Sequence, residues 1–393
     1  MNRPAVYLSG AVRTPIGRFG GGFQGFPAPR LGAAAAREAL RRSGLSPGEI
    51  QETVFGCARQ AGVGPNPARQ VAHLAGVPDR SPAFTVNQAC ASGLQAILLA
   101  ARSVASGESD PVLAGGAENM SRVPYLMESA RFGARMGHAE LTDGMFRDGF
   151  LCPLCGLIMG ETAENLAREY GISREEQDRY AAQSQQRYQL SRERGTVREE
   201  IVPVEVEGPR GTAVRIESDE HPRKDVTPQT LARLDPVYGE GGTITAGSAS
   251  GITDGGAAVI VSGKRPASPG PVARLTGWSR VGVEPSRMGI GPVPAIRRLL
   301  SDTGLSLDQI DLVELNEAFA AQVLACQKEL RIDPDRLNPN GGAIAMGHPI
   351  GCSGARIVVT LIHEMARRKA RYGIAALCVS GGMGVAALLE PAA

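Results

Sequence analysis

The stretch Ala36-Arg-Glu-Ala-Leu-Arg-Arg-Ser-Gly-Leu-Ser-Pro-Gly-Glu-Ile50 recurs in similar form as Ala295-Ile-Arg-Arg-Leu-Leu-Ser-Asp-Thr-Gly-Leu-Ser-Leu-Asp-Gln-Ile310. In both copies a run of helix-forming residues ends at a glycine, and Leu-Ser and a closing isoleucine follow. A glycine directly after a helical run is typical of a helix C-terminus. The recurrence indicates that the chain contains two similar halves.

The similarity continues further along each half. Cys90-Ala-Ser-Gly93 opens an apolar pattern with helical spacing, and Gly351-Cys-Ser-Gly354 opens another. Each pattern is followed by a short apolar run that ends in a glycine pair, at 111–116 and at 375–382. Two α/β halves of the same design are therefore predicted.

One long segment separates the halves' otherwise matching parts. In the second half, the apolar run 384–390 follows the glycine pair at once and is expected to be its hairpin partner. The matching run of the first half, 256–262, arrives only after residues 119–250, which therefore read as an insertion. Helices are expected within 162–187, the second capped by Ser173 with Glu176 as its capping box. Such an insertion is a natural place for a cover over bound substrate.

Length and charge limit the kinds of partner. The chain has 393 residues, 42 Lys and Arg against 40 Asp and Glu, and 42% hydrophobic residues. This length predicts two or three structural units, and the balanced charge disfavours nucleic acid as a partner. No stretch reaches the ~20 apolar residues that span a bilayer, and no secretion signal is recognisable, so we expect no membrane association and a cytoplasmic location. The seven cysteines are expected to be free thiols.

Three side chains are candidates for nucleophilic or acid–base chemistry. Cys90 precedes an Ala- and Leu-rich helix whose N-terminal dipole favours a thiolate, although a small buried cysteine that only fills space is the alternative. His348, in Gly347-His-Pro349, can accept a proton near neutral pH. Cys378 lies in an apolar run just before Ser380-Gly-Gly382, where core packing is again the simpler interpretation. The other histidines, at 73, 138, 221 and 363, read as ordinary helical or surface positions.

Other motifs are weaker or absent. Asn316, after the run 310–315, could hold a water or a carbonyl oxygen, or simply cap the next helix. Cys152-Pro-Leu-Cys155 has thioredoxin-like spacing but no second pair or nearby histidine, so zinc is disfavoured. The glycine-rich segment 17–25 lacks the Gly-Lys-Ser/Thr of a phosphate loop, and no dinucleotide-binding glycine pattern is present.

Taken together, these motifs resemble the thiolase family over essentially the whole chain. The nucleophile motif is matched by Asn87-Gln-Ala-Cys-Ala-Ser-Gly93 and the asparagine motif by Asn316-Glu-Ala-Phe319. The histidine motif is matched by Gly347-His-Pro-Ile-Gly351, and the C-terminal cysteine motif by residues 378–384. The run Gly115-Gly-Ala-Glu-Asn-Met-Ser121 is also typical of the family.

The resemblance implies a thiolase fold of the α/β class. Its two duplicated βαβαβαββ halves are stacked in a layered αβαβα arrangement, with an inserted loop domain that binds coenzyme A. On this basis we expect an N-terminal half over 1–121, completed by 251–270, a loop domain over 122–250 and a C-terminal half over 271–393. Homodimers or homotetramers are implied, with residues 122–145 as a candidate tetramer contact.

The resemblance also implies the reaction, a reversible acyl transfer between coenzyme A thioesters that makes or cleaves a carbon–carbon bond. Cys90 would become acylated with His348 as its base, and Cys378 would remove the α-proton of a second acyl-CoA. One oxyanion site would be formed by His348 and a water on Asn316, the other by the backbone N–H groups of Cys90 and Ser380. No metal or redox cofactor is expected.

Coenzyme A contacts are implied in the same way. Arg223 would hold the nucleotide end and Ser250 the pantetheine, while Met159, Ala318 and Phe319 would line the acyl tunnel. Three positions depart from the usual family pattern, and they are Ser380 for Gly, Ser248 for Asn, and Ile158 where short-chain biosynthetic members often have His. The last departure leaves chain-length preference open.

Two other functions are compatible with parts of this pattern. A non-catalytic acyl-CoA-binding protein would keep the fold but would need none of Cys90, Asn316, His348 and Cys378. A Cys/His thioester hydrolase would release the acyl group to water and would not need Cys378. The presence of all four residues favours the thiolase.

Overall fold

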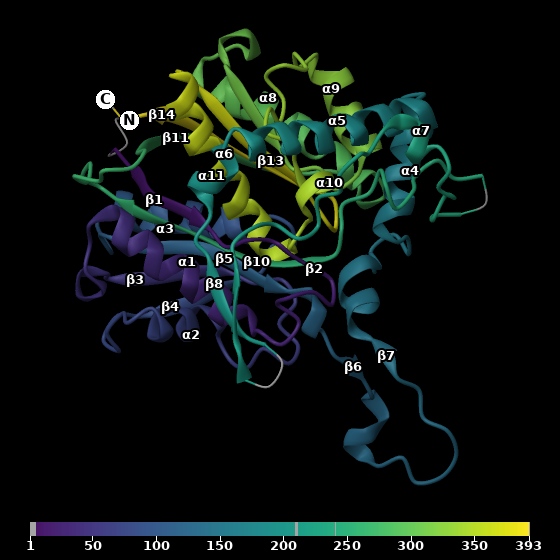
Figure 1. The fold of residues 1–393 in the computed structure, drawn as a ribbon, viewed down its shortest axis with the longest axis horizontal. Coiled ribbons are helices and arrows are strands. Elements are labelled where there is room, and N and C mark those ends of the chain that lie inside the picture. The colour runs from purple at the N-terminus through teal and green to yellow at the C-terminus, as the bar shows by residue number, and fades with distance from the viewer. Residues whose placement is uncertain (1–4, 209–210, 240, 393) are drawn as a thin grey trace.

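The computed structural model describes residues 5–208, 211–239 and 241–392, and nine main strands form one continuous sheet within them (Figure 1). The strand order is β12-β13-β14-β11-β1-β10-β5-β3-β4, and the short β2 (Gly17–Arg18) pairs with β10. The main strands are β1 (Tyr7–Arg13), β3 (Glu52–Gly56), β4 (Ala83–Val86), β5 (Val112–Asn119), β10 (Thr253–Ser262), β11 (Ala273–Gly282), β12 (Leu312–Leu315), β13 (Gly373–Val379) and β14 (Met383–Pro391).

The two halves of this sheet have the same topology, which confirms the predicted duplication. From the centre outward, the first half runs β1-β10-β5-β3-β4 and the second runs β11-β14-β13-β12. In each half the inner pairings are antiparallel and the outer ones parallel. Leu337, bridged in parallel to Val313, takes the place of β4 in the second half. The halves join where β1 and β11 pair antiparallel.

Helices pack on the sheet in layers. In the first half α1 (Ala28–Ser43) packs on β10 and β1, and α2 (Pro67–Leu74) packs on α1. In the second half α8 (Pro292–Thr303) packs on β14 and β11, with α9 (Ala320–Leu330) beside it. Between the halves lie α3 (Ser92–Ser106) and α11 (Ile350–Arg368), which contact each other as well as strands of the sheet.

The central helices α3 and α11 are buried along most of their length, and α11 buries Arg356, His363 and Glu364 together with its apolar residues. The window Ala89–Ser106 is long and apolar enough to cross a bilayer by length and composition alone. Two-thirds of it, 67%, is buried inside the protein, so the fold uses it as a core helix.

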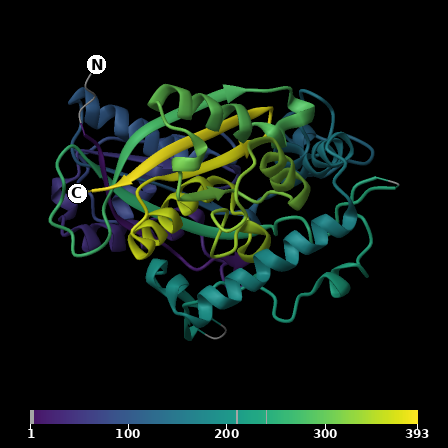
Figure 2. The same ribbon diagram turned by 90° about the horizontal axis from the view of Figure 1, so that it is seen from above.

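The inserted segment forms its own small set of elements. These are α4 (Met159–Glu169), α5 (Arg174–Glu193), α6 (Thr196–Glu200), the hairpin of β8 (Val204–Glu207) and β9 (Ala213–Ile216), and α7 (Pro228–Leu231). Of these, α4 and α5 pack on the second half and the β8–β9 hairpin packs against the first. The long α5 crosses the face of the molecule in Figure 2. Its N-terminus has the predicted capping box, in which Ser173 and Glu176 bond each other's backbone N–H groups.

The buried carboxylate of Glu317 ties this insertion to the second half. It accepts hydrogen bonds from the hydroxyls of Tyr180 and Ser184 on α5, at 2.9 and 2.7 Å. It also accepts the Ile344 backbone N–H, in the short helix α10 (Ala343–Met346) just before His348. The carboxyl group of Glu317 thus holds both α5 and the loop that carries His348.

Residues 122–145, called the arm below, project away from the body of the molecule (Figure 1). The arm contains the two-stranded ribbon of β6 (Tyr125–Leu126) and β7 (Thr142–Asp143). Its tip leaves large apolar side chains in solvent, since Phe132 is 90% and Met136 98% exposed.

Candidate active site

The N-termini of α3 and α11 meet at glycines, and this contact places Cys90 beside the segment of His348. A Cβ on Gly93 would lie 2.7 Å from the Ala355 nitrogen, and one on Gly354 would lie 2.4 Å from the Leu94 nitrogen. Only glycine permits this approach of two helix backbones. Cys90 and His348 each lie two residues before the first residue of their helix, so the crossing brings both to one point between the halves.

The turn that carries Cys90 is braced by its neighbours. Ala89 has a left-handed backbone, with φ of 44°, a strained conformation for a residue with a Cβ. The side chain of Asn87 accepts the Ala89 N–H at 3.0 Å and donates to the Ala58 carbonyl. Ser92 Oγ accepts the Gln88 N–H and donates to the Ala89 carbonyl. Asn87 and Ser92 lie within the nucleophile motif. They stabilise the left-handed backbone of Ala89, which no sequence pattern predicts.

The thiol of Cys90 corrects one expectation. The helix end was expected to favour the thiolate, but burial raises the pKa of Cys90 above its usual value. The backbone N–H groups of Ser380 and Cys90 itself, and the charge of Arg59, lower the pKa but do not outweigh burial. Cys90 is therefore a protonated thiol in the free protein and needs a base. Ser380 approaches it through backbone N–H, which its departure from glycine leaves intact.

His348 is a buried, neutral imidazole. Burial, followed by the charges of Arg356 and Arg59, lowers its pKa to about 3. Its Nδ1 lies 2.5 Å from Ser353 Oγ, and that hydroxyl donates to the Pro349 carbonyl at 3.0 Å. Ser353 therefore accepts the proton on Nδ1, and Nε2 carries the free lone pair. Nε2 faces the amide of Asn316 at 3.5 Å.

Asn316 and Cys378 lie at the ends of neighbouring parallel strands. Asn316 directly follows β12 and donates its backbone N–H to the Ala376 carbonyl of β13 at 2.9 Å. Cys378 is the next-to-last residue of β13 and is fully buried. Burial first, and then the charge of Cys90, raise the pKa of the Cys378 thiol well above its usual range. Cys90 packs against the cluster that contains Val379 and accepts the backbone N–H of Ser380, so the end of β13 that carries Cys378 lies beside Cys90.

Apolar side chains surround Cys378 on the side of the insertion. Ala318 and Phe319 are buried in the same cluster, and Met159, the first residue of α4, packs against it. Tyr238 closes this cluster, with its ring edge-on to Phe319 at 5.9 Å between centroids. The structure thus brings together all three residues predicted for the acyl tunnel.

The loop 245–251 connects these groups. Ser250 donates its backbone N–H to the Ala318 carbonyl at 3.0 Å, and the Gly251 carbonyl accepts the His348 N–H at 3.0 Å. Ser248 is buried and accepts the Thr245 N–H, so serine keeps this turn closed. Arg223 lies outside the cluster, exposed on the insertion.

His221 differs from its expected surface position. Its ring packs so closely on Gly251 that a Cβ there would lie 2.2 Å from it, and burial with the charge of Arg223 lowers its pKa to about 4. Sequence reasoning also missed the role of Glu118, the next-to-last residue of β5. Its carboxylate accepts backbone N–H groups from Ala58, Arg59 and Gly351, and so ties the first half to the start of α11. The signal in the sequence was an acidic residue directly after the apolar, glycine-rich run 112–117.

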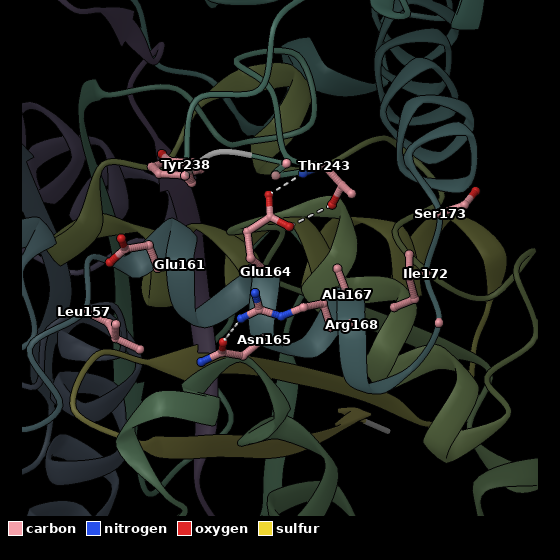
Figure 3. A pocket seen from close by; sticks show the side chains of 14 residues that line it. Leu157, Glu161, Glu164, Asn165, Ala167, Arg168, Ile172, Ser173, Tyr238 and Thr243 are labelled. Carbon is pink, nitrogen blue, oxygen red and sulfur yellow. Dashed lines mark hydrogen bonds between the residues drawn. The ribbon is translucent and has the colours of Figure 1, made fainter.

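A pocket of about 490 Å³ lies outside this cluster, beside α4 (Figure 3). It shares only Ala167 and Tyr238 with the apolar cluster around Cys378. Glu164 lies in its wall but is already bonded to Thr243 and Ile244. The pocket is therefore separate from the catalytic residues, and Tyr238 both lines the pocket and packs against the cluster around Cys378.

The fold and motifs have well-characterised relatives. Residues 6–265 match the family described as thiolase, N-terminal domain, and residues 270–391 match thiolase, C-terminal domain. An acetyl-CoA acetyltransferase of Pseudomonas aeruginosa is 49% identical over 98% of both chains. A crystal structure of the Bacillus anthracis acetyl-CoA acetyltransferase has a TM-score of 0.95 and 42% identity, over 99% of each chain. Human mitochondrial 3-ketoacyl-CoA thiolase in complex with CoA gives 0.93 and 39%, over 99% of this chain and 98% of that one.

The chain belongs to the thiolase family. Its activity is that of a thiolase, an acyltransferase, and the predicted fold class is confirmed. Neither the non-catalytic binding protein nor the thioester hydrolase gains support from these relatives.

Proposed function

We propose that this thiolase transfers an acyl group reversibly between coenzyme A thioesters through an acyl-Cys90 intermediate. One observation carries the proposal. The crossing of α3 and α11 brings Cys90 to the segment of His348, and the Cys90 sulfur accepts the N–H of Ser380, two residues after Cys378. Two thiols of raised pKa beside a neutral imidazole suit two proton transfers and one acyl relay.

Acylation begins from a neutral pair. As Cys90 attacks the thioester carbonyl, its proton passes to the free Nε2 of His348, which the Ser353 hydrogen bond leaves unprotonated. The backbone N–H groups of Cys90 and Ser380 lie beside the Cys90 sulfur. There they would stabilise the negative charge that develops on the thioester oxygen. Coenzyme A thiol leaves with the proton from His348.

Condensation uses Cys378 as the base. Burial, the larger cause of the raised pKa of Cys378, persists after acylation, so the Cys378 thiol must first give its proton to Nε2 of His348, which the first step leaves unprotonated. That thiolate takes the α-proton of a second acyl-CoA. The enolate oxygen would be held by protonated Nε2 of His348 and a water on Asn316. Asn316 Oδ1 is buried and has no hydrogen-bond partner among the described residues, so it has capacity for that water.

Coenzyme A would lie across the insertion, and one relative, human mitochondrial 3-ketoacyl-CoA thiolase, is described as a complex with CoA. Arg223 would hold its nucleotide end and Ser250 its pantetheine, which leads the thioester to Met159, Ala318 and Phe319 beside Cys378. The proposed reaction needs no resident metal or redox cofactor, because Cys90, His348 and Cys378 supply the nucleophile and the proton transfers.

The remaining features of the proposal concern assembly and organisation. The half-exposed edge strand β4 and the apolar tip of the arm support a homodimer or homotetramer. Residues 1–121 with 251–270 form one half, 122–250 the loop domain for coenzyme A, and 271–393 the other half. The enzyme acts in the cytoplasm, on coenzyme A thioesters.

The test mixes the protein with acetoacetyl-CoA and coenzyme A and follows loss of the 3-oxo thioester. Turnover to two acetyl-CoA molecules per acetoacetyl-CoA is expected, with loss of activity in Cys90→Ser and no loss in the matched variant Cys155→Ser. Release of free acetate instead would identify a hydrolase. Folded protein that turns over neither acetoacetyl-CoA nor longer 3-oxoacyl-CoA would overturn the proposal.

A further inference from the structure

Cys152 and Cys155 lie in a closed turn that neither acylation nor condensation uses. Leu151 and Ile158 are bridged antiparallel at its base, and the Cys152 N–H donates to the Leu157 carbonyl at 2.8 Å. The Gly156 N–H donates back to the Cys152 carbonyl at 2.8 Å, and Gly156 has a φ of +70°. Pro153 fixes its own φ inside this turn. The backbone therefore holds both cysteines on one tight loop.

Cys152 and Cys155 stand three residues apart in that closed turn. Burial first raises the pKa of Cys155, its sulfur accepts the N–H of Leu157, and a hydrogen bond with Cys152 raises the pKa further. Both cysteines are free thiols, and the backbone hydrogen bonds that close the turn hold them on one short loop. Cys152 is fully buried, whereas Cys155 is partly exposed.

The turn also borders the catalytic pocket on two sides. A Cβ on Gly381, the residue after Ser380, would lie 3.8 Å from Cδ1 of Leu154 at the tip of the turn. On its other side the turn leads through Ile158 into Met159, which packs on the cluster of Cys378. A change in the conformation of this turn would therefore move both the segment of Ser380 and the start of α4 at Met159.

We propose that Cys152 and Cys155 form a dithiol–disulfide modification site, oxidised by low-molecular-weight disulfides, whose state alters turnover in the adjacent pocket. The thiolate of the partly exposed Cys155 attacks one sulfur of the small disulfide and releases one thiol. Cys152 then attacks the sulfur of Cys155 and releases the second thiol. One S–S bond is exchanged for another, and the two cysteine protons leave on the two small thiols.

The environment of Cys155 favours the disulfide over the dithiol. Because burial does not stabilise the thiolate of Cys155, the reduced form gains nothing from ionisation. Closing the bond brings the sulfurs to about 2.05 Å, closer than any hydrogen-bonded pair. The turn has to tighten, and Leu154 and Met159 are the groups through which that movement reaches the pocket.

The first experiment maps the bond in Cys90→Ser protein, so that the catalytic thiol does not react. The folded protein is incubated with glutathione disulfide, digested with trypsin and examined by mass spectrometry without reduction. The peptide 148–168, which contains both cysteines, should lose two hydrogens and regain them with dithiothreitol. Added Cys152→Ser should instead yield glutathione attached to Cys155. Two free thiols in this peptide, at an oxidant concentration that glutathionylates Cys155 in the Cys152→Ser protein, would overturn the site.

The second experiment measures function with Cys90 intact. Wild type and Cys155→Ser are treated with the same oxidant, and kcat/KM for acetoacetyl-CoA thiolysis is compared with that of untreated protein. A reversible change of twofold or more, confined to the wild type, is expected. Equal responses of the two proteins would trace the change to Cys90 and overturn the effect of the pair on turnover. Thiolysis by the untreated proteins tests the catalytic proposal separately.

Discussion

Replacing Ser353 by alanine should disable the base without touching substrate. Ser353 Oγ accepts the Nδ1 proton of His348 at 2.5 Å and is itself held by the Pro349 carbonyl at 3.0 Å. Ser353→Ala leaves that buried N–H without an acceptor. An unsatisfied buried donor of this kind is destabilised by about 1–3 kcal/mol.

The imidazole has a better arrangement available in the variant. Its proton can move to Nε2, where Asn316 Oδ1, which has no partner among the described residues, can accept it after an amide flip. That tautomer has no lone pair facing the pocket and is not a base for Cys90. Since each 1.36 kcal/mol is a factor of ten in rate, the expected fall in kcat is roughly 5- to 150-fold.

The assay follows steady-state thiolysis of acetoacetyl-CoA and the single-turnover acetylation of Cys90. Both rates should fall together in Ser353→Ala with little change in KM, because the residue does not touch coenzyme A. Ser103→Ala, which removes a buried serine hydroxyl from α3, is the matched control and should retain activity. A Ser353→Ala enzyme with wild-type kcat would refute the assigned tautomer.

Three further predictions concern stability, specificity and helix packing. The pKa of His348 is about 3 when folded and 6.5 when unfolded, so the unfolded state binds more protons between these values and stability falls as pH decreases. Between pH 7 and pH 5, the free energy of unfolding should fall by about 2 kcal/mol less in His348→Asn than in the wild type, as measured by denaturant unfolding. Equal falls in the two proteins would contradict a buried neutral imidazole. Tyr238→Ala should open the tunnel toward the outer pocket and raise kcat/KM for 3-oxooctanoyl-CoA relative to acetoacetyl-CoA roughly tenfold. Tyr238→Phe serves as the control, and an unchanged ratio in Tyr238→Ala would exclude this wall. Gly93→Ala should lower the melting temperature and kcat together, because its Cβ would lie 2.7 Å from the Ala355 nitrogen, and full activity would show that the helices can separate without loss.

The duplicated architecture was predictable because its signals are local. Short stretches of consecutive residues reveal the helices that end at Gly44 and Gly304. They also reveal the glycine pairs between apolar runs. The structure then repeats one strand order in both halves. What the local patterns do not contain is how the halves face each other, which depends on the contact of Gly93 with α11.

The chemical groups were also visible in sequence, but their electrostatics were not. The helix end beside Cys90 predicted a lowered pKa, whereas burial between the halves raises it. Desolvation is a property of the assembled pocket and has no sequence signature. The same holds for His221 and Glu118, whose partners lie far away along the chain. Sequence therefore identified which residues could react, and three-dimensional packing determined their protonation.

The most direct test of the two-cysteine relay is the intact mass of the protein after incubation with acetyl-CoA. Wild type and Cys378→Ser should each gain one acetyl group, while Cys90→Ser should gain none. Only the wild type should then form acetoacetyl-CoA when more acetyl-CoA is supplied. An acetyl group on Cys90→Ser, or condensation by Cys378→Ser at the wild-type rate, would contradict the account.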